Sequence, residues 1–185
     1  RGVEGGDLPT GWAYGAVSPD YSAPRTAGIR VVLLDRGLRH DVAQTSPWLL
    51  AGAKTLSYAV NRAAAREAVR RGADDAVFVS SDGFLLEGPT ANLVLRRGDA
   101  LLTPRIDQGI LAGTTQGDLF DFAAQRGLTA SQQLLRPEDL TSADAAWLVS
   151  SVRHAAPIRS VDGVERSIDR ELSDAMNAFL RGRTS

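Results

Sequence analysis

The chain has 185 residues, 43% of them hydrophobic and 23% charged, which is the composition of one ordinary soluble domain with a buried core. A formal net charge of -1 argues against a general affinity for nucleic acid or an anionic membrane, because binding to either needs a basic surface. The sequence has no cysteine, which excludes disulfides, thiolate metal sites and cysteine nucleophiles, and neither His40 nor His154 has a companion at metal-ligand spacing.

The N-terminal end has no initiator methionine, and residues 1–7 predict a loop, so we expect a fragment or a trimmed chain. No apolar run is long enough to cross a bilayer, and the first residues lack the pattern of a signal peptide, so we expect a cytoplasmic protein. Residues 13–17 favour a short strand. Residues 18–26 contain proline and serine and favour a loop.

Residues 29–34 are apolar and β-branched, and they predict a buried strand that ends at a turn over residues 35–37. Lys54 follows the uncharged, apolar residues 48–53, so we expect its side chain to enter the interior. Burial lowers the pKa of an amine and makes it available as a nucleophile or a base. The alternative is a solvated lysine just ahead of a helix.

The middle of the chain predicts a helix followed by two hairpins. Residues 57–71 are rich in alanine and end at Gly72, which predicts the helix. Apolar residues flank Asp82-Gly83, which predicts a hairpin and places Glu87 at the end of a strand. Residues 92–95 and 100–102 predict the second hairpin.

The last third alternates helices and strands. A threonine with an acid three residues on, in the segment Gly113 to Asp118, predicts a helix that starts with a capping box. The remaining elements are a strand at 128–134, a short helix opened by Pro137, a strand at 145–149, a small hairpin at 159–164 and an amphipathic helix at 169–180. Together these elements predict a mixed α/β domain with a mostly antiparallel sheet and helices outside it.

Besides Lys54, four residues are candidates for chemistry, and each has a structural alternative. Glu87 is either a rim residue or a carboxylate for a cation such as a protonated heteroaromatic nitrogen, whose pKa it would raise. Thr114 and Thr115 at the predicted helix start offer hydroxyls and free N–H groups for a phosphate, or they only cap the helix. Ser151 follows a strand and belongs either to a turn or to an anion site.

A lysine for a Schiff base, a glutamate for a ring nitrogen and hydroxyl-rich turns for a phosphate are what pyridoxal 5′-phosphate (PLP) needs. The chain resembles the larger, C-terminal domain of fold-type IV PLP enzymes from about Leu33 to Gly163. That family includes branched-chain and D-amino-acid aminotransferases and 4-amino-4-deoxychorismate lyase. The resemblance implies a pseudo-barrel sheet with outer helices over residues 28–185, with residues 1–27 as the remnant or linker of a smaller N-terminal domain.

The resemblance assigns roles residue by residue. Lys54-Thr55-Leu56-Ser57 resembles the Schiff-base segment, and Glu87-Gly88 with Asn92-Leu93 is similar to the segment whose glutamate holds the pyridine nitrogen. Gly113-Thr114-Thr115-Gln116 resembles the phosphate turn, although Gln116 departs from the usual arginine, and Ser151 stands where a phosphate-binding threonine is frequent. Tyr58 is spaced differently from the aminotransferase pattern, so its role stays open.

The stretch from Thr103 to Gln108 resembles aminodeoxychorismate lyases, which implies release of pyruvate and 4-aminobenzoate. That substrate carries two carboxylates, so Arg105 and Arg153 are candidates for binding it, with ordinary surface arginines as the alternative. Transamination at the same site is a second hypothesis, and a cofactor-free fragment or a generic anion-binding module are others. The resemblance also implies a homodimer with a small-molecule substrate.

Overall fold

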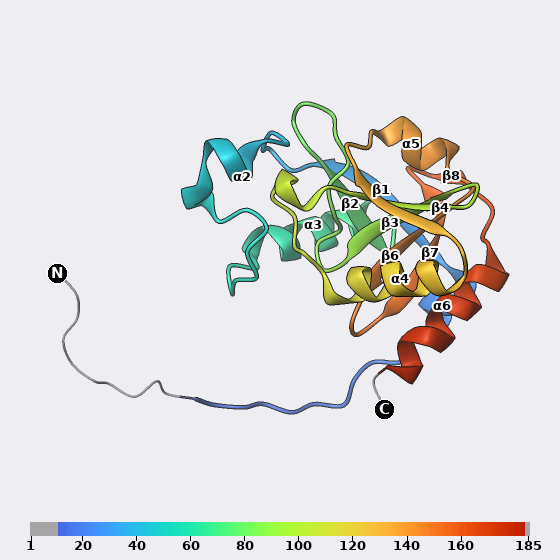
Figure 1. The fold of residues 1–185 in the computed structure, drawn as a ribbon. Helices are drawn as coiled ribbons and strands as arrows, with labels where there is room; N and C mark the ends of the chain where they lie inside the picture. Colours follow the sequence, from blue (N-terminus) through green and yellow to red (C-terminus); the bar gives the residue numbers. More distant parts are fainter. Residues whose placement is uncertain (1–10, 184–185) are drawn as a thin grey trace.

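The computed structural model describes residues 11–183 of the chain. The loop expected at residues 1–7 lies outside the described residues. Within them, no helix has both the length and the apolar character needed to cross a membrane. Figure 1 shows one mixed sheet with helices packed around it and an extended segment, residues 11–20, that runs away from the sheet.

The described residues form an eight-stranded sheet in the order β2-β1-β7-β6-β3-β4-β5, with β8 paired to β7. Three pairs are parallel, β1 with β2, β1 with β7 and β4 with β5, and the other pairs are antiparallel. The strands are β1 Ile29–Asp35, β2 Asp75–Val79, β3 Asn92–Arg97, β4 Ala100–Pro104, β5 Thr129–Gln133, β6 Ala145–Ser150, β7 His154–Val161 and β8 Val164–Glu165. The predicted α/β fold with a mixed sheet is therefore confirmed.

The long helices follow the sequence pattern closely. They are α3 Ala59–Arg70, α4 Thr114–Gln125 and α6 Arg170–Gly182, and the short helix opened by Pro137 is α5 Pro137–Ser142. Four further turns of helix had no sequence prediction: α1 Ser22–Ala27, α2 Val42–Thr45, η1 Pro47–Leu49 and η2 Ile106–Gln108. The loop predicted at 18–26 therefore contains most of α1.

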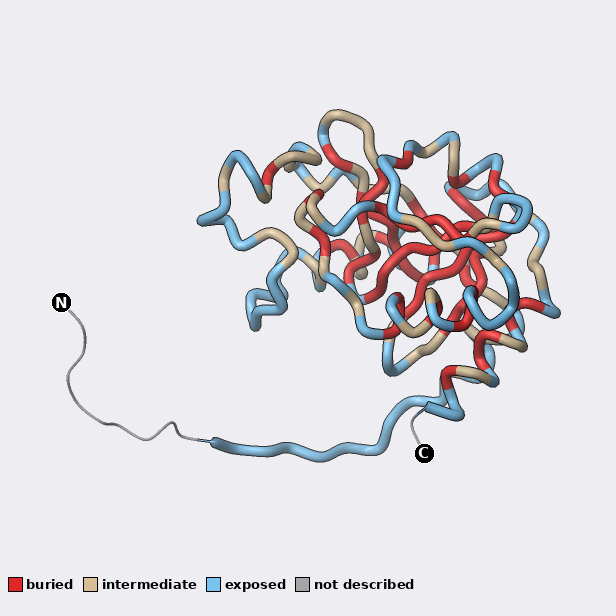
Figure 2. Tube along the Cα trace, viewed as in Figure 1, coloured by how far each residue is buried: buried red, intermediate tan, exposed pale blue. Residues whose placement is uncertain are grey.

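Alternation along the central strands builds a core on each face of the sheet. On one face, Val94 and Trp147 pack against α4 and α6, where the rings of Phe122 and Phe179 lie 5.5 Å apart. Figure 1 shows these two helices side by side. On the other face the core is formed by aliphatic side chains of β1, β3, β6 and β7 together with Leu135 and Leu140. Figure 2 shows this buried centre and the exposed segments at its edge.

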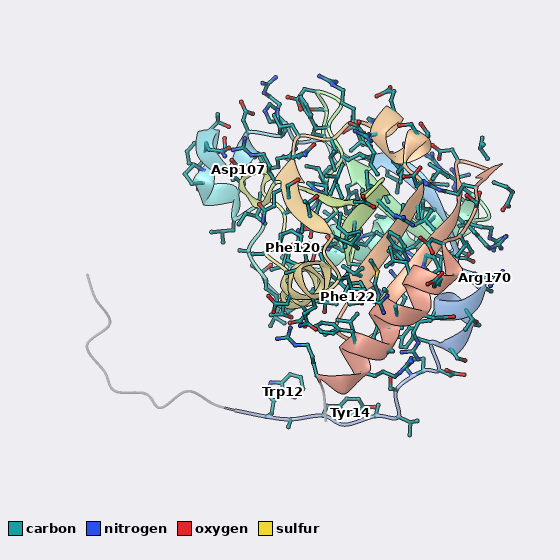
Figure 3. The ribbon with its side chains drawn as sticks, turned by 45° about the vertical axis from the view of Figure 1, so that its right-hand side comes forward. Trp12, Tyr14, Asp107, Phe120, Phe122 and Arg170 are labelled. Carbon is teal, nitrogen blue, oxygen red and sulfur yellow. The ribbon has the colours of Figure 1, made fainter. Side chains whose placement is uncertain are left out.

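The strand predicted at residues 13–17 is wrong, because these residues form no ladder with the sheet. Trp12, Tyr14 and Val17 are 86%, 84% and 98% exposed, and Figure 3 shows Trp12 and Tyr14 projecting from the extended segment. A strand needs a neighbour for its backbone groups, and local composition does not supply one.

Candidate functional site

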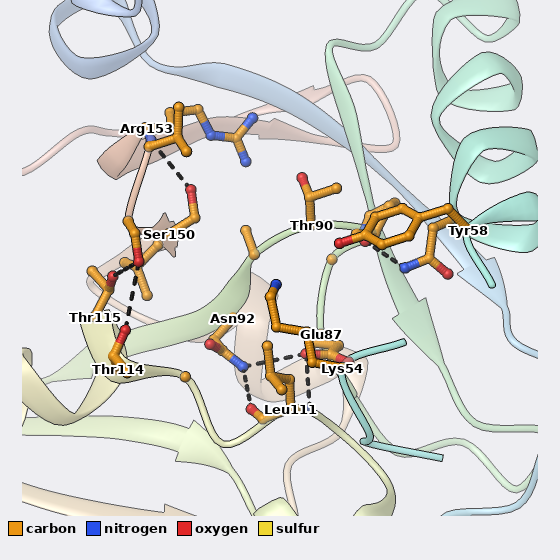
Figure 4. A pocket seen from close by; sticks show the side chains of 18 of the residues that line it. Lys54, Tyr58, Glu87, Thr90, Asn92, Leu111, Thr114, Thr115, Ser150 and Arg153 are labelled. Atoms are coloured by element: carbon orange, nitrogen blue, oxygen red, sulfur yellow. Dashed lines mark hydrogen bonds between the residues drawn. The ribbon is translucent and has the colours of Figure 1, made fainter. Parts of the chain in front are cut away.

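A cavity of about 700 Å³ lies where β3, β6 and the start of α4 come together. Its wall includes all five residues that the resemblance assigned to a cofactor, namely Lys54, Glu87, Thr114, Thr115 and Ser151. In Figure 4, Lys54, Glu87 and Asn92 lie on one side, and Thr114, Thr115 and the turn after β6 lie on another. Residues 97 positions apart in the sequence, from Lys54 to Ser151, therefore share one cavity.

Glu87 is a half-buried carboxylate held by two donors. Its Oε2 accepts a hydrogen bond from the backbone N–H of Leu111 at 3.2 Å and one from Asn92 Nδ2 at 3.3 Å. Burial raises the pKa of Glu87 to about 7, and the Leu111 N–H and the charges of Arg36 and Lys54 oppose that rise. The carboxylate therefore lies in surroundings where a cationic partner would keep it ionised.

Asn92 was not singled out as a site residue from the sequence. It is 5% exposed, and its Nδ2 also donates to the backbone oxygen of Leu111 at 2.8 Å, so it joins Glu87 to the segment before α4. A Cβ atom on Gly113 would stand 1.9 Å from Asn92 Oδ1, which leaves room only for glycine there. An asparagine at the start of an otherwise apolar strand was the signal in the sequence.

Lys54 does not enter the interior, so that prediction is wrong. The lysine is exposed at the cavity wall, and the apolar residues before it are exposed as well, Trp48 at 73% and Leu50 at 62%. Between η1 and α3 the backbone makes only local turns, such as Ala53 N to Leu50 O at 3.0 Å, and no strand packs this segment into the core. The amine is accordingly accessible to a ligand in the cavity.

Three hydroxyls gather at the N-terminal end of α4. Ser151 Oγ lies 3.5 Å from Thr114 Oγ1 and 3.3 Å from Thr115 Oγ1. The predicted capping box is wrong, because Gly113 is the N-cap residue and no side chain caps the helix. With the hydroxyls turned toward Ser151, the first N–H groups of α4 and the helix dipole remain available to an anion such as a phosphate.

The structure places the two predicted substrate arginines differently. Arg105 lies outside the cavity lining and forms an ion pair with Asp107. Arg153 does line the cavity, yet its Nη2 donates to Asp75 Oδ2 at 2.8 Å, and the two side chains are 14% and 8% exposed. This buried pair ties the turn that carries Ser151 to β2.

Gln116 also points away from the cavity. It is 3% exposed, and its Nε2 donates to Thr103 Oγ1 at 2.7 Å inside the core. Two further residues of α3 and its start, Tyr58 and Arg62, line the cavity. Arg62 had no signal in the sequence, because arginines repeat along the whole helix. Among the residues that the structure describes, no cluster of three His, Asp or Glu side chains could hold a metal ion.

Comparisons with known proteins agree with this geometry. The family described as amino-transferase class IV matches residues 16–161. A bifunctional aminodeoxychorismate lyase / D-amino acid transaminase of Mycobacterium tuberculosis is 46% identical over 173 residues, which cover 88% of this chain and 59% of the relative. The fold IV transaminase CpuTA1 of Curtobacterium pusillum is 57% identical with a TM-score of 0.87, and the match covers 90% of this chain and 56% of that one.

A hypothetical aminotransferase of Mycobacterium tuberculosis in its PLP-bound form is 41% identical with a TM-score of 0.83 and covers 88% of this chain and 59% of that one. The chain thus spans less than two thirds of the length of these relatives. Because the family match extends over most of the sequence and the similarity to the first relative covers nearly all of it, the chain belongs to the class IV aminotransferase family.

Proposed function

We propose that this chain forms the PLP-binding part of an enzyme that acts on amino-acid-like substrates, with aminodeoxychorismate lyase activity as the first candidate. The observation that carries the proposal is one cavity containing an accessible lysine amine, a carboxylate with a raised pKa and three clustered hydroxyls at a helix start. Its volume of about 700 Å³ is within the range of about 300–1,000 Å³ typical of small-molecule sites.

The donor set fits the parts of PLP. Lys54 would bind the carbonyl carbon through its amine, and Thr114, Thr115 and Ser151 would orient the phosphate. Glu87 would hold a protonated ring nitrogen, because an ionised carboxylate beside that nitrogen keeps it charged. When bound, PLP supplies an electron sink for charge that develops beside the substrate amine.

Lys54 would then act as a base once its amine is released by the incoming substrate. In the lyase reaction Lys54 would remove a ring proton from aminodeoxychorismate, the bond between the ring and the ether oxygen would break as the ring becomes aromatic, and the departing enolpyruvate would take up a proton to give pyruvate. Transamination is the second candidate, because the 46% identical relative bears both activities in its name. In that reaction the Lys54 amine would take the proton from the substrate carbon beside the amine and hold it for the next transfer.

Covalent trapping tests the cofactor assignment. Lys54 is the only lysine in the sequence, so treatment with PLP and borohydride should give a pyridoxyl adduct on one identifiable peptide. Lys54→Ala is the matched control and should give no side-chain adduct. Absence of the adduct in the unsubstituted protein would contradict the proposal.

Product analysis separates the two reactions. Incubation with aminodeoxychorismate should release pyruvate and 4-aminobenzoate. The chain would be a transaminase and not a lyase if one sample gives the Lys54 adduct with borohydride and an untreated sample behaves as follows. The untreated sample releases no pyruvate from aminodeoxychorismate but forms glutamate from 2-oxoglutarate and a D-amino acid.

A further inference from the structure

Glu87 borders a second, smaller cavity of about 30 Å³. Among the described residues, Glu87 alone lines both this cavity and the large one. Other residues of the small cavity include Arg36, Phe78 and Gln108, and Lys54 is absent from its lining. The carboxylate therefore separates the large cavity from a compartment that contains a different cation.

Arg36 is fixed in this compartment through β2. Its backbone N–H donates to Val79 O at 2.8 Å, and its guanidinium lies 4.8 Å from the centre of the Phe78 ring. Phe78 in turn pairs with the residues around the carboxylate, since its N–H donates to Glu87 O at 2.9 Å. Phe78, on whose ring the Arg36 guanidinium lies, is thus joined through its backbone to Glu87.

The guanidinium of Arg36 has no carboxylate within ion-pair distance in the part of the chain that the structure describes. Burial lowers its pKa from the ordinary value, and the charge of Glu87 opposes that effect. Arginine stays charged in proteins, so the half-buried cation acts on Glu87 at every accessible pH. Glu87 is the anionic group whose charge acts on Arg36.

Gln108 makes the same compartment polar. Its side chain is 2% exposed and lines the small cavity, and its Nε2 has no hydrogen-bond partner among the described residues. Gln108 Oε1 is already used by the backbone N–H of Arg105 at 3.1 Å. Arg36 and Gln108 therefore both line the small cavity with side-chain donors, beside Arg39, whose guanidinium pairs with Asp41 and Asp82.

Two cations and two uncharged donors surround Glu87: Arg36 from the end of β1, Lys54 from the segment before α3, and the N–H groups of Asn92 and Leu111. Lys54 cannot serve as a constant counter-charge if its amine is consumed in binding a carbonyl, whereas Arg36 takes no part in such a bond. Arg36 is therefore the cation that acts on the Glu87 carboxylate whether or not Lys54 has formed a bond.

We propose that Arg36 is a positioning residue that acts through Glu87: its guanidinium, seated on Phe78, favours the ionised form of the carboxylate that a protonated ring nitrogen in the large cavity would need. The part of this inference that concerns the ring nitrogen rests on the proposed function, whereas the effect of Arg36 on the ionisation of Glu87 does not.

The test is a titration of Glu87 in the cofactor-free protein, followed by NMR of ¹³C-labelled glutamate side chains and assigned with Glu87→Gln. Arg36→Met should shift the Glu87 titration upward by about one pH unit, the lower end of the effect of a nearby opposite charge. Arg36→Lys should retain most of the unsubstituted behaviour. Arg39→Met is the matched control, because Arg39 lines the same small cavity but pairs with Asp41 and Asp82, and it should leave the titration unchanged.

PLP affinity gives a second readout. With the carboxylate about half ionised at pH 7 in the unsubstituted protein and about one tenth ionised in Arg36→Met, PLP affinity should fall about fivefold at pH 7 and hardly at all near pH 9. Arg36→Gln supplies a second uncharged variant if Arg36→Met does not fold. An unshifted titration in a folded uncharged variant, or equal shifts in Arg36→Lys and Arg36→Met, would overturn the inference. Whether PLP binds at Lys54 is tested separately by the borohydride adduct, so failure of the proposed function and failure of this inference can be told apart.

Discussion

Replacing Glu87 with glutamine should stabilise the cofactor-free protein at neutral and alkaline pH. Burial raises the pKa of the carboxyl to about 7 from the ordinary 4.5, a difference that corresponds to about 3 kcal/mol at about 1.4 kcal/mol per unit. Glutamine keeps a side-chain oxygen that can accept from the Leu111 N–H and from Asn92, so both hydrogen bonds have a replacement. The substitution therefore removes the cost of ionisation and little else.

The pH dependence of this effect has a definite direction. Below pH 4.5 the Glu87 carboxyl is protonated in the folded and the unfolded chain alike, and its ionisation costs nothing. As the pH rises from 4.5 to about 7, the unfolded chain ionises first, so the free energy of unfolding of the unsubstituted protein falls. Above about pH 7 the loss of unfolding free energy in the unsubstituted protein is constant, and Glu87→Gln should be more stable than it by up to about 3 kcal/mol.

Urea unfolding of both cofactor-free proteins, at pH values from about 4 to about 9, measures this difference directly. The gain in stability of Glu87→Gln should be near zero at the acidic end and should grow through the window between the two pKa values. A gain of the same size at every pH would show that ionisation is not its source. A variant that is less stable at alkaline pH would refute the reasoning about burial.

The other predictions concern the helix start and the turn after β6. Gly113→Ala should lower the free energy of unfolding, because its Cβ would stand 1.9 Å from Asn92 Oδ1, whereas Gly117→Ala, with nothing within 4 Å, should raise it by up to about 1 kcal/mol; equal effects in urea unfolding would contradict this. Thr115→Val should weaken binding of PLP about tenfold in a fluorescence titration and leave binding of pyridoxal, which has no phosphate, unchanged; equal losses for both ligands would count against a phosphate site. Arg153→Met should cost about 3–5 kcal/mol of unfolding free energy by leaving a buried carboxylate unpaired, and a loss below about 1 kcal/mol would show that the pair is solvated.

Local patterns predicted most of the helices and strands, because the signals that specify them are local. Alanine-rich periodicity predicted α3, and Asp82-Gly83 between apolar runs predicted the turn after β2. The second strand of that hairpin does not form, since Val79 and Leu85 make only an isolated bridge and Glu87 follows no strand. The sequence did not predict which strands pair with β1 in parallel. Its pairing with β7 sets Ile29 beside Ile158, and no property of either segment alone specifies the other.

For the site as well, local motifs predicted some features, whereas others depend on the tertiary arrangement. Motif resemblance selected Glu87 and Ser151, and both line the cavity, but the partner of Arg153 depends on where β2 begins, far away in the sequence. The apolar residues before Lys54 predicted burial, yet an apolar run carries no information about what covers it. Exposure of that segment is a property of the tertiary arrangement around it.

The cavity unites parts of the chain that differ in local stability. Asn92 and Thr115 belong to well-packed elements and are each 5% exposed, whereas residues 53–57 are exposed and belong to no helix or strand. Segments of this second kind open with small free energies, so their amide hydrogens exchange readily with solvent. A ligand that joins Lys54 to the groups on the sheet would slow exchange at residues 53–57 by mass action. Hydrogen exchange of this segment would then report occupancy of the cavity without any need for turnover.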